Sequence, residues 1–312
     1  MIGSRDLAAI TNGILMKTTH YLVIVLICLT YAAAAQASSK NVNNTAVIDV
    51  PKPRIIALSP HIVEILFKIG AGDQIIATTD YADYPLAAQK IPKIGSASRI
   101  QLERVIELQP DLIIAWRSGN PSDDLARIKQ LGFNVVYSQP DSFEDLANEV
   151  RLLGKLSGHI EQADRVATKF LTDLDKIKKQ YGNKAPLTGF YEVWSRPLTT
   201  IAKGSWPQQF LDICSIKNPF HQAQAQYPQV NIEQILQTNI DVIIVPLSTK
   251  QANEDAYDWQ KWPILKAVKH QQMIKLNADV AHRMTTRSLH ALTELCQQAE
   301  KSRQYYQQVI GE

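Results

Sequence analysis

The chain has 312 residues, which suits about two domains at ~150 residues each, and 45% of the residues are hydrophobic, enough for a sizeable core. Basic and acidic residues are mixed along the chain and leave a net charge of only +3. This balance gives no support for a nucleic-acid partner, which would require a basic stripe.

The first 37 residues differ from the rest of the chain. Lys17 and His20 precede an apolar run over 21–35, and Ala35-Gln36-Ala37 follows. A basic region, an apolar run and small residues in this order predict a secretory signal peptide over 1–37, starting at Met1 or Met16. The run is shorter than the ~20 apolar residues of a membrane span, although an uncleaved anchor stays an alternative. The polar stretch 38–53 is predicted to be a disordered linker.

Strand and helix patterns alternate from Arg54 onward. The run Ile55–Leu58 predicts a strand, and Ser59-Pro60 predicts a helix start with proline at its first position. Further strands are predicted at 74–78, 111–116 and 134–137. Such alternation indicates a parallel sheet covered by helices, so we predict an N-terminal α/β lobe over 54–156.

A long helical pattern interrupts this alternation. Apolar residues recur every three or four positions from Ile160 to Tyr181. We therefore predict a connecting helix over 157–182, the longest in the chain. Strands are predicted again at 187–193, 199–202, 241–246 and 273–276, in a C-terminal α/β lobe over 183–312. The predicted fold class is α/β, with two Rossmann-like lobes built on parallel sheets and joined by a single long α-helix.

Two cysteines, Cys214 and Cys296, remain once the signal is removed. In an oxidising compartment a lone pair more often forms a disulfide than two free thiols. We expect one bridge that ties the second lobe to its terminal helix.

The two lobes also share a sequence repeat. Leu102-Glu103-Arg104-Val105-Ile106 leads to the strand that begins at Asp111, and Ile232-Glu233-Gln234-Ile235-Leu236 leads with the same spacing to the strand that begins at Asp241. General strand–helix patterning is one explanation, but the matched Glu, Asp and apolar positions favour related lobes. An acid near a helix N-terminus is favourable by ~0.3–1 kcal/mol by itself. A matched pair further predicts two acidic contacts for a partner with cationic sites.

Five segments carry a resemblance to a known family: 54–60, 80–85, 102–104, 111–120 and 227–230. They resemble the periplasmic cobalamin-binding proteins of ABC importers. These proteins belong to the helical-backbone class of solute-binding proteins, which also contains ferric-siderophore and haem binders, and the resemblance covers roughly 54–302. It implies a periplasmic protein that captures cobalamin (vitamin B12) between its lobes and delivers it to the permease dimer of an ABC importer in the inner membrane. We expect a monomer with no cofactor of its own.

The resemblance also implies ligand-binding residues. Tyr81, Trp116 and Tyr227 match aromatic residues that line the family's ligand cleft, and Trp194 and Arg196 lie in a segment that resembles a second-lobe cleft segment. A corrin is a broad, partly apolar disc edged with amides, so flat rings with polar tips suit it. Open α/β sheets bind ligands just past their strand ends, where Tyr81, Trp116 and Trp194 are predicted to lie.

Other roles follow from the same resemblance. Glu103 and Glu233 match the acids that dock onto arginines of the permease, in agreement with the repeat. Cys214 and Cys296 match the family's disulfide pair.

This sequence departs from the best-known relatives at three cleft positions. Ala97, Val193 and Thr199 stand where those relatives carry aromatic residues. Fewer rings weaken or reshape stacking on a corrin, so a ferric siderophore or haem is the alternative ligand.

No metal site or catalytic motif is predicted. The seven His residues are scattered, with no pair at metal-ligand spacing, and no nucleophile elbow or phosphate loop is present. A secreted α/β enzyme is the alternative from another class. Arg283 and Arg287, near the start of the last helix, are expected on a solvated face.

Overall fold

The computed structural model describes residues 52–96, 98–248 and 257–310. The predicted signal peptide, most of the predicted linker and Ala97 lie outside these ranges. Lys52–Glu312 is one compact unit, and no helix within the described part is both long and apolar enough to cross a membrane.

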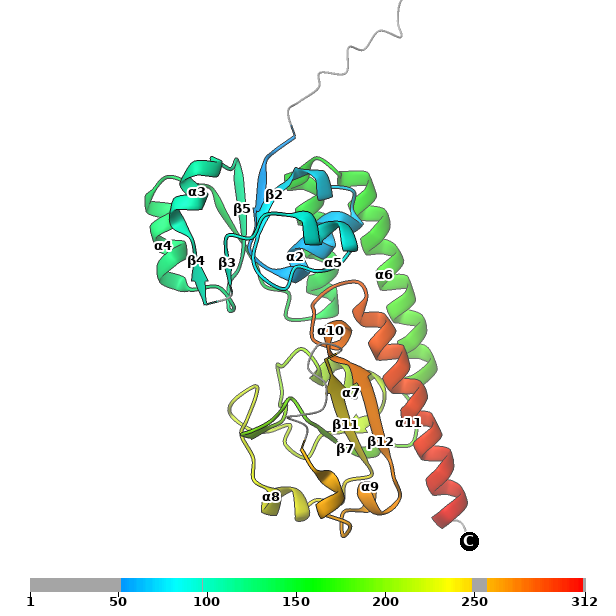
Figure 1. Ribbon diagram of the computed structural model, residues 1–312. Coiled ribbons are helices and arrows are strands. Elements are labelled where there is room, and N and C mark those ends of the chain that lie inside the picture. Colours follow the sequence, from blue (N-terminus) through cyan, green and yellow to red (C-terminus); the bar gives the residue numbers. More distant parts are fainter. Residues whose placement is uncertain (1–51, 97, 249–256, 311–312) are drawn as a thin grey trace, which may run out of the picture. The chain divides into compact units, whose positions relative to one another are not determined.

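The first half of the unit contains a four-stranded parallel sheet in the order β2-β1-β5-β6 (Figure 1). Its strands are β1 (Ile55–Ala57), β2 (Ile75–Thr78), β5 (Leu112–Trp116) and β6 (Val135–Ser138). Its helices are α2 (Pro60–Lys68), α3 (Leu102–Leu108), α4 (Ser122–Gln130) and α5 (Phe143–Ser157). A short antiparallel pair, β3 (Gly95–Ser96) and β4 (Arg99–Ile100), precedes α3.

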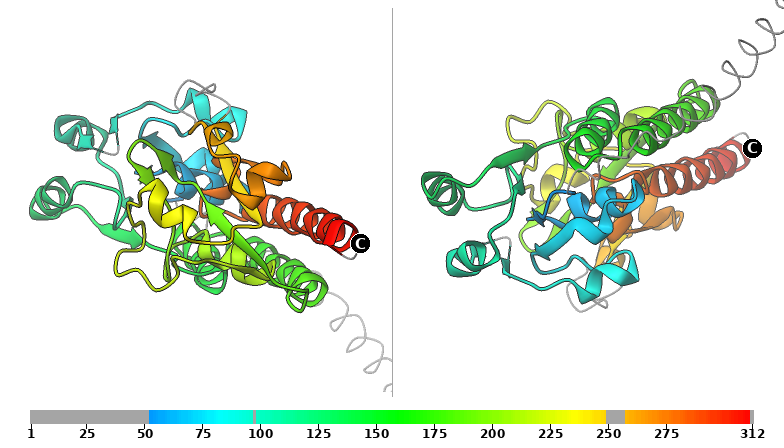
Figure 2. Two further views of the ribbon diagram at one scale, coloured as in Figure 1. Left: turned by 90° about the horizontal axis from the view of Figure 1, so that it is seen from below. Right: turned by 90° about the horizontal axis from the view of Figure 1, so that it is seen from above.

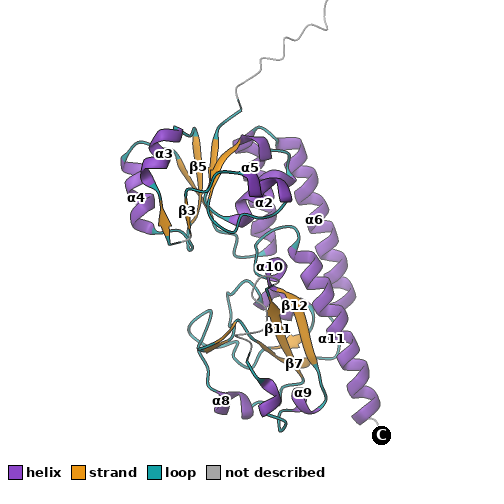
Figure 3. Cartoon of the chain, viewed as in Figure 1, coloured by secondary structure: helices purple, strands orange, loops and turns teal. Residues whose placement is uncertain are grey.

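The second half repeats this arrangement with a sheet in the order β10-β7-β11-β12, again with parallel neighbours (Figure 3). Its strands are β7 (Leu187–Tyr191), β10 (Ile216–Lys217), β11 (Val242–Leu247) and β12 (Met273–Asn277). Its helices are α7 (Gln208–Ile213), α8 (Ile232–Leu236), α9 (Lys266–Lys269), α10 (Ala278–Ala281) and α11 (Ser288–Ile310).

The helix α6 (Ile160–Tyr181) connects the two sheets. The predicted α/β class, with parallel sheets and one long connecting helix, is therefore confirmed. The expectation that this is the longest helix is wrong, because α11 has 23 residues and α6 has 22. The two helices contact each other, α6 in green and α11 in red (Figure 2).

Alternation along the strands divides the core into layers. Ile55 and Ala57 of β1 belong to a cluster that also contains residues of α2, α5, α6 and α11, whereas Ile56 belongs to a separate cluster with α3 and α4. In β11, Val242 and Ile244 join the first cluster, and other side chains of the strand pack with α8 and α9. Successive strand residues point to opposite faces, so each sheet packs against a separate cluster on one face. The cluster on the other face is shared by both sheets.

The second sheet differs from the prediction at one strand. Residues 199–202 do not form a parallel strand; instead β8 (Trp194–Ser195) and β9 (Leu198–Thr199) form a small antiparallel hairpin after β7. The edge strand β10 was not predicted, because its two residues are too few to show a strand period.

Candidate functional site

In the first half, two aromatic residues lie at or just past strand ends. Tyr81 lies in the loop after β2 with φ 64°, and its side chain is 72% exposed. Its carbonyl accepts a hydrogen bond from Arg283 Nη2 at 3.3 Å. Trp116 is the last residue of β5, is partly exposed, and meets the His61 ring edge-on at 5.6 Å between centroids.

The turn after β5 fixes the position of Trp116. Asn120 Oδ1 accepts from the Trp116 backbone N–H at 2.7 Å, and its Nδ2 donates to the Leu58 carbonyl at 2.9 Å. A Cβ at Gly119 would lie 1.8 Å from Trp116 Cε3, so the turn accommodates the indole ring only with glycine at this position.

In the second half, the β8–β9 hairpin presents Trp194, which is 64% exposed, and Arg196, which is also exposed. The Val193 N–H donates to the Thr199 carbonyl at 2.8 Å and closes the hairpin. Thr199 stands at one of the three cleft positions where the best-known relatives carry an aromatic residue. It is buried, and its hydroxyl donates to the Pro197 carbonyl at 2.9 Å.

Tyr227 lies in a loop that runs beside this hairpin, since the Thr200 N–H donates to the Pro228 carbonyl at 3.0 Å. Its side chain is 42% exposed. Partial burial raises the pKa of the Tyr227 phenol, and the negative charge of Asp141, from the first half, adds to the rise. The loop therefore lies beside the hairpin, and the Tyr227 phenol is within electrostatic reach of the first half.

These five residues come from four segments, two in each half, because Trp194 and Arg196 share the β8–β9 hairpin, and each of the five is at least partly exposed. Within the described ranges no ring–ring contact joins Tyr81, Trp116, Trp194 and Tyr227. Their surfaces are thus available to a ligand rather than used in packing against one another.

A buried polar chain lies behind Trp116. His61 Nδ1 pairs with the Ser59 hydroxyl at 2.6 Å, and its Nε2 pairs with the Ser138 hydroxyl at 2.8 Å. The Ser138 hydroxyl donates in turn to Glu149 Oε1. Burial lowers the pKa of His61 to about 3 and raises the pKa of Glu149 to about 7. His61 is therefore neutral and holds its place beside the indole through both ring nitrogens.

Arg283 and Arg287 form an ion-pair cluster, so their expected position on a solvated face is wrong. Arg283 Nη1 donates to Glu64 Oε1 at 2.9 Å and to Asp83 Oδ1 at 2.8 Å, and Arg287 Nε donates to Glu64 Oε2 at 2.8 Å. The side chain of Glu64 is only 3% exposed. A buried carboxylate requires cationic partners, and the acid within the apolar run Ile62 to Leu66 is the sequence signal for them.

The two predicted docking acids lie on the surface. Glu103 and Glu233 occupy the first turns of α3 and α8 and are exposed. Neither carboxylate has a hydrogen-bond or ion-pair partner among the residues that the structure describes.

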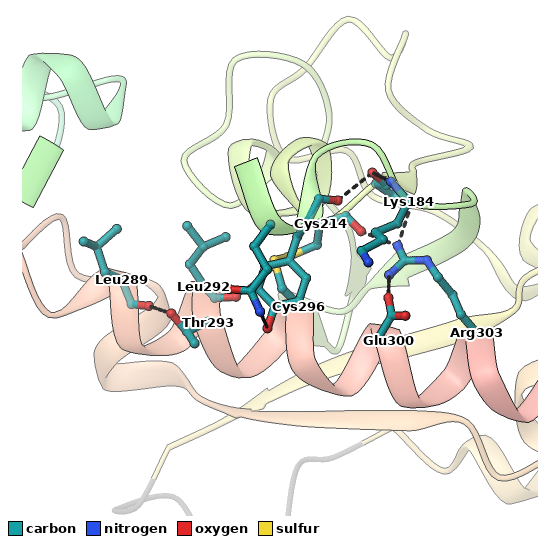
Figure 4. The surroundings of a disulfide bond; sticks show 11 residues. Lys184, Cys214, Leu289, Leu292, Thr293, Cys296, Glu300 and Arg303 are labelled. Atoms are coloured by element: carbon teal, nitrogen blue, oxygen red, sulfur yellow. Dashed lines mark hydrogen bonds and ion pairs between the residues drawn. A yellow bond between two sulfur atoms is a disulfide. The ribbon is translucent and has the colours of Figure 1, made fainter. Parts of the chain in front are cut away.

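Cys214 and Cys296 form the predicted disulfide, with Cα atoms 4.8 Å apart (Figure 4). Cys214 directly follows α7 and Cys296 lies in α11, so the bridge ties the second half to its terminal helix, as expected. Arg303 of α11 supports the same junction, because its guanidinium donates to the Ala185 carbonyl at 2.6 Å and to the Cys214 carbonyl. Within the described ranges, no three His, Cys, Asp or Glu side chains are grouped so that they could hold a metal ion.

Comparisons with known proteins agree with this arrangement. A sequence profile of the periplasmic binding protein family matches residues 55–280. The vitamin B12-binding protein of Vibrio cholerae serotype O1 is 35% identical over 247 residues, which cover 79% of this chain and 88% of that protein. The crystal structure of the periplasmic vitamin B12 binding protein BtuF of Vibrio cholerae matches with a TM-score of 0.74 at 34% identity, covering 81% of this chain and 98% of that one.

A more distant match shows the fold alone. The periplasmic heme-binding protein RhuT from Roseiflexus sp. RS-1 has a TM-score of 0.71 at 19% identity and covers 80% of this chain and 99% of that one. The family profile spans most of the compact unit, and the Vibrio cholerae relative is matched over nearly its whole length. The chain therefore belongs to the periplasmic binding protein family.

Proposed function

We propose that this protein is exported to the periplasm, captures cobalamin between its two halves, and delivers it to an ABC importer. Exposed aromatic rings at the strand ends of both halves carry the proposal, above all Tyr81 at 72% and Trp194 at 64% exposure. Further support comes from the 34% identity to the vitamin B12 binding protein of Vibrio cholerae over 98% of that chain.

The proposed contacts follow from the shape of the ligand. Tyr81 and Trp116 cover the corrin from the first half, and Trp194 and Tyr227 cover it from the second, since rigid aromatic rings bury a large area at low entropic cost. Arg196 and the tyrosine hydroxyls hydrogen-bond the amide rim or the phosphate. Cobalamin is cargo in this account rather than a cofactor, and it leaves chemically unchanged.

The ligand is tested by calorimetry of the purified protein with cyanocobalamin, haem and a ferric hydroxamate siderophore. We expect one cobalamin per chain, quenching of tryptophan fluorescence, and recovery of unaltered cobalamin after release. Tighter binding of haem or of the siderophore would assign the alternative cargo. Chemical conversion of any of the three would favour the alternative of an enzyme.

Delivery is proposed to depend on Glu103 and Glu233, which engage cationic residues of a permease dimer while the carrier itself is a monomer. The double variant Glu103→Lys/Glu233→Lys should retain its affinity for cobalamin and lose transport in reconstituted proteoliposomes. Glu161→Lys, an exposed acid on α6, is the matched control and should transport normally. Loss of cobalamin binding by the double variant would contradict a docking role.

A further inference from the structure

The segments 101–110 and 231–240 share the same pattern of buried, half-buried and exposed residues over all ten positions. Each segment contains a short helix, α3 or α8, followed by the turn that leads into the central strand β5 or β11. Both helices lie on the side of the unit away from α11 (Figures 1 and 2). The repeat therefore extends from the sequence to the surface that each half presents.

The aspartates of the repeat have a structural role in each half. Asp111 Oδ2 accepts from the Arg54 N–H at 2.8 Å, and Asp241 Oδ2 accepts from the Thr188 N–H at 2.7 Å. The backbone returns each bond, from the Asp111 N–H to the Arg54 carbonyl and from the Asp241 N–H to the Thr188 carbonyl. These bonds join the central strands at corresponding points and explain the shared aspartate.

The exposed apolar residues of the repeat have no structural role comparable to that of the aspartates. Ile106 and Leu236 follow Glu103 and Glu233 by three residues, so each lies on the same helix face as its acid. Their side chains are 43% and 36% exposed, and neither belongs to a core cluster of its half. A single exposed apolar residue is ordinary, but these two recur at the same position beside the same acid.

The charged residues of α3 and α8 differ, but the two helices have the same net charge. On α3, Arg104 pairs with Glu107 at 2.6 Å, whereas the corresponding residues of α8 are the neutral Gln234 and Gln237. Each surface thus carries one net negative charge, that of its repeat glutamate.

We propose that Ile106 and Leu236 are the apolar anchors of a duplicated docking surface, formed by Glu103 with Ile106 and by Glu233 with Leu236. The partner is a two-fold symmetric permease dimer, each subunit of which presents a cation beside an apolar depression. This rests on the delivery role proposed above. An exposed ion pair contributes little because water and salt screen it, whereas an adjacent apolar side chain that becomes buried adds affinity that salt does not screen. A two-fold symmetric partner presents the same binding site on each subunit. The two copies of the docking surface on this protein can therefore bind one subunit each.

The test measures binding of the cobalamin-loaded protein to a cobalamin importer, permease and ATPase subunits together, in lipid nanodiscs. Ile106→Ser and Leu236→Ser should each weaken binding roughly five- to tenfold, since each removes a partly exposed aliphatic side chain from the interface. The double variant should lose about the product of the two factors. Ile160→Ser and Leu152→Ser are matched controls, because both residues are exposed on other helices, and they should bind like the wild type.

The outcomes separate this inference from the function on which it rests. If the serine variants bind the importer normally while Glu103→Lys/Glu233→Lys does not, delivery stands and the apolar anchors are refuted. If the wild type fails to bind the importer, or the charge-reversed variant binds as well as the wild type, the docking function itself is refuted and the inference with it. Normal cobalamin affinity in every serine variant confirms that their effect lies at the docking surface.

Discussion

Glu149 is a buried carboxylate on α5, at the end of the chain Ser59–His61–Ser138 that supports Trp116. Burial raises its pKa from the ordinary 4.5 to about 7, against the hydrogen bonds from Ser138 and the Gln139 backbone. The folded state thus favours the protonated form. The stability that this form contributes is complete below pH 4.5 and is lost as the pH rises through 7.

Glu149→Gln should remove this pH dependence, because the amide stays neutral and can still accept from Ser138. The wild-type free energy of unfolding should fall by on the order of 3 kcal/mol between pH 4.5 and 8 relative to the variant. Urea denaturation of both proteins across this range measures the difference. Parallel curves for the two proteins would contradict a raised pKa at Glu149.

Trp194 is the most exposed tryptophan among the proposed ligand contacts. Trp194→Ala should weaken cobalamin binding roughly tenfold or more, since an aromatic side chain at the centre of an interface contributes about 1.5 kcal/mol or more. Calorimetry checks this against Ile264→Ala, a change at an 80% exposed apolar residue of the same half. Equal cobalamin affinities of Trp194→Ala and the wild type would show that the β8–β9 hairpin does not take part in ligand binding.

At the scale of elements, the Cys214–Cys296 bridge closes a segment of 82 residues that includes most of the second sheet. Cys214→Ala/Cys296→Ala should lower the free energy of unfolding by about 2–5 kcal/mol, because the unfolded chain loses a long cross-link. Arg303 still joins α11 to the strand ends, so we expect the native fold to persist. The urea midpoints of unfolding of the wild type and the double variant, with and without reductant, test this prediction. A wild-type midpoint that does not change when reductant is added would contradict it.

Elements with long periodic patterns could be predicted from the sequence, and those whose form depends on tertiary contacts could not. The strand β5 is a continuous apolar run and the helix α6 has apolar residues every three or four positions, and both lie close to their predicted bounds. The expectation that α6 is the longest helix is wrong, because α11 is longer although its buried positions include Arg303 and the disulfide cysteine Cys296, which do not belong to an apolar pattern. The β8–β9 hairpin depends on cross-strand bonds between two-residue strands, too short for a pattern.

The site could be predicted in part for the same reason. Trp116 lies at the end of the recognisable strand β5 and Trp194 lies shortly after β7, so the partial exposure of Trp116 and the exposure of Trp194 could be anticipated. The partners of Arg283 and Arg287 lie about 200 residues away along the chain, at Asp83 and Glu64. Contacts between residues so far apart produce no local pattern in the sequence. The sequence signal for them is Glu64, an isolated acid in an otherwise apolar stretch of α2.

For the molecule as a whole, Glu64 joins α2 of the first half to the segment between α10 and α11, 219 residues away at Arg283. Glu64→Gln removes the carboxylate that two half-buried guanidinium groups share, and among the described residues only Arg283 keeps another carboxylate partner, Asp83. This should destabilise the protein by about 3 kcal/mol, the lower end of the range for breaking a buried ion pair. The control is Glu107→Gln, which removes an exposed pair with Arg104 and should change stability by about 1 kcal/mol at most. Similar urea midpoints for both variants would show that the cluster does not hold the halves together.

The central claim is that one cobalamin contacts both halves of the unit. Hydrogen–deuterium exchange of the full chain, with and without a stoichiometric excess of cyanocobalamin, measures this directly. We expect slower exchange in the loops around Tyr81 and Trp116 and, in the same complex, around Trp194 and Tyr227. Protection confined to the loops of one half, or absent from both, would contradict the account.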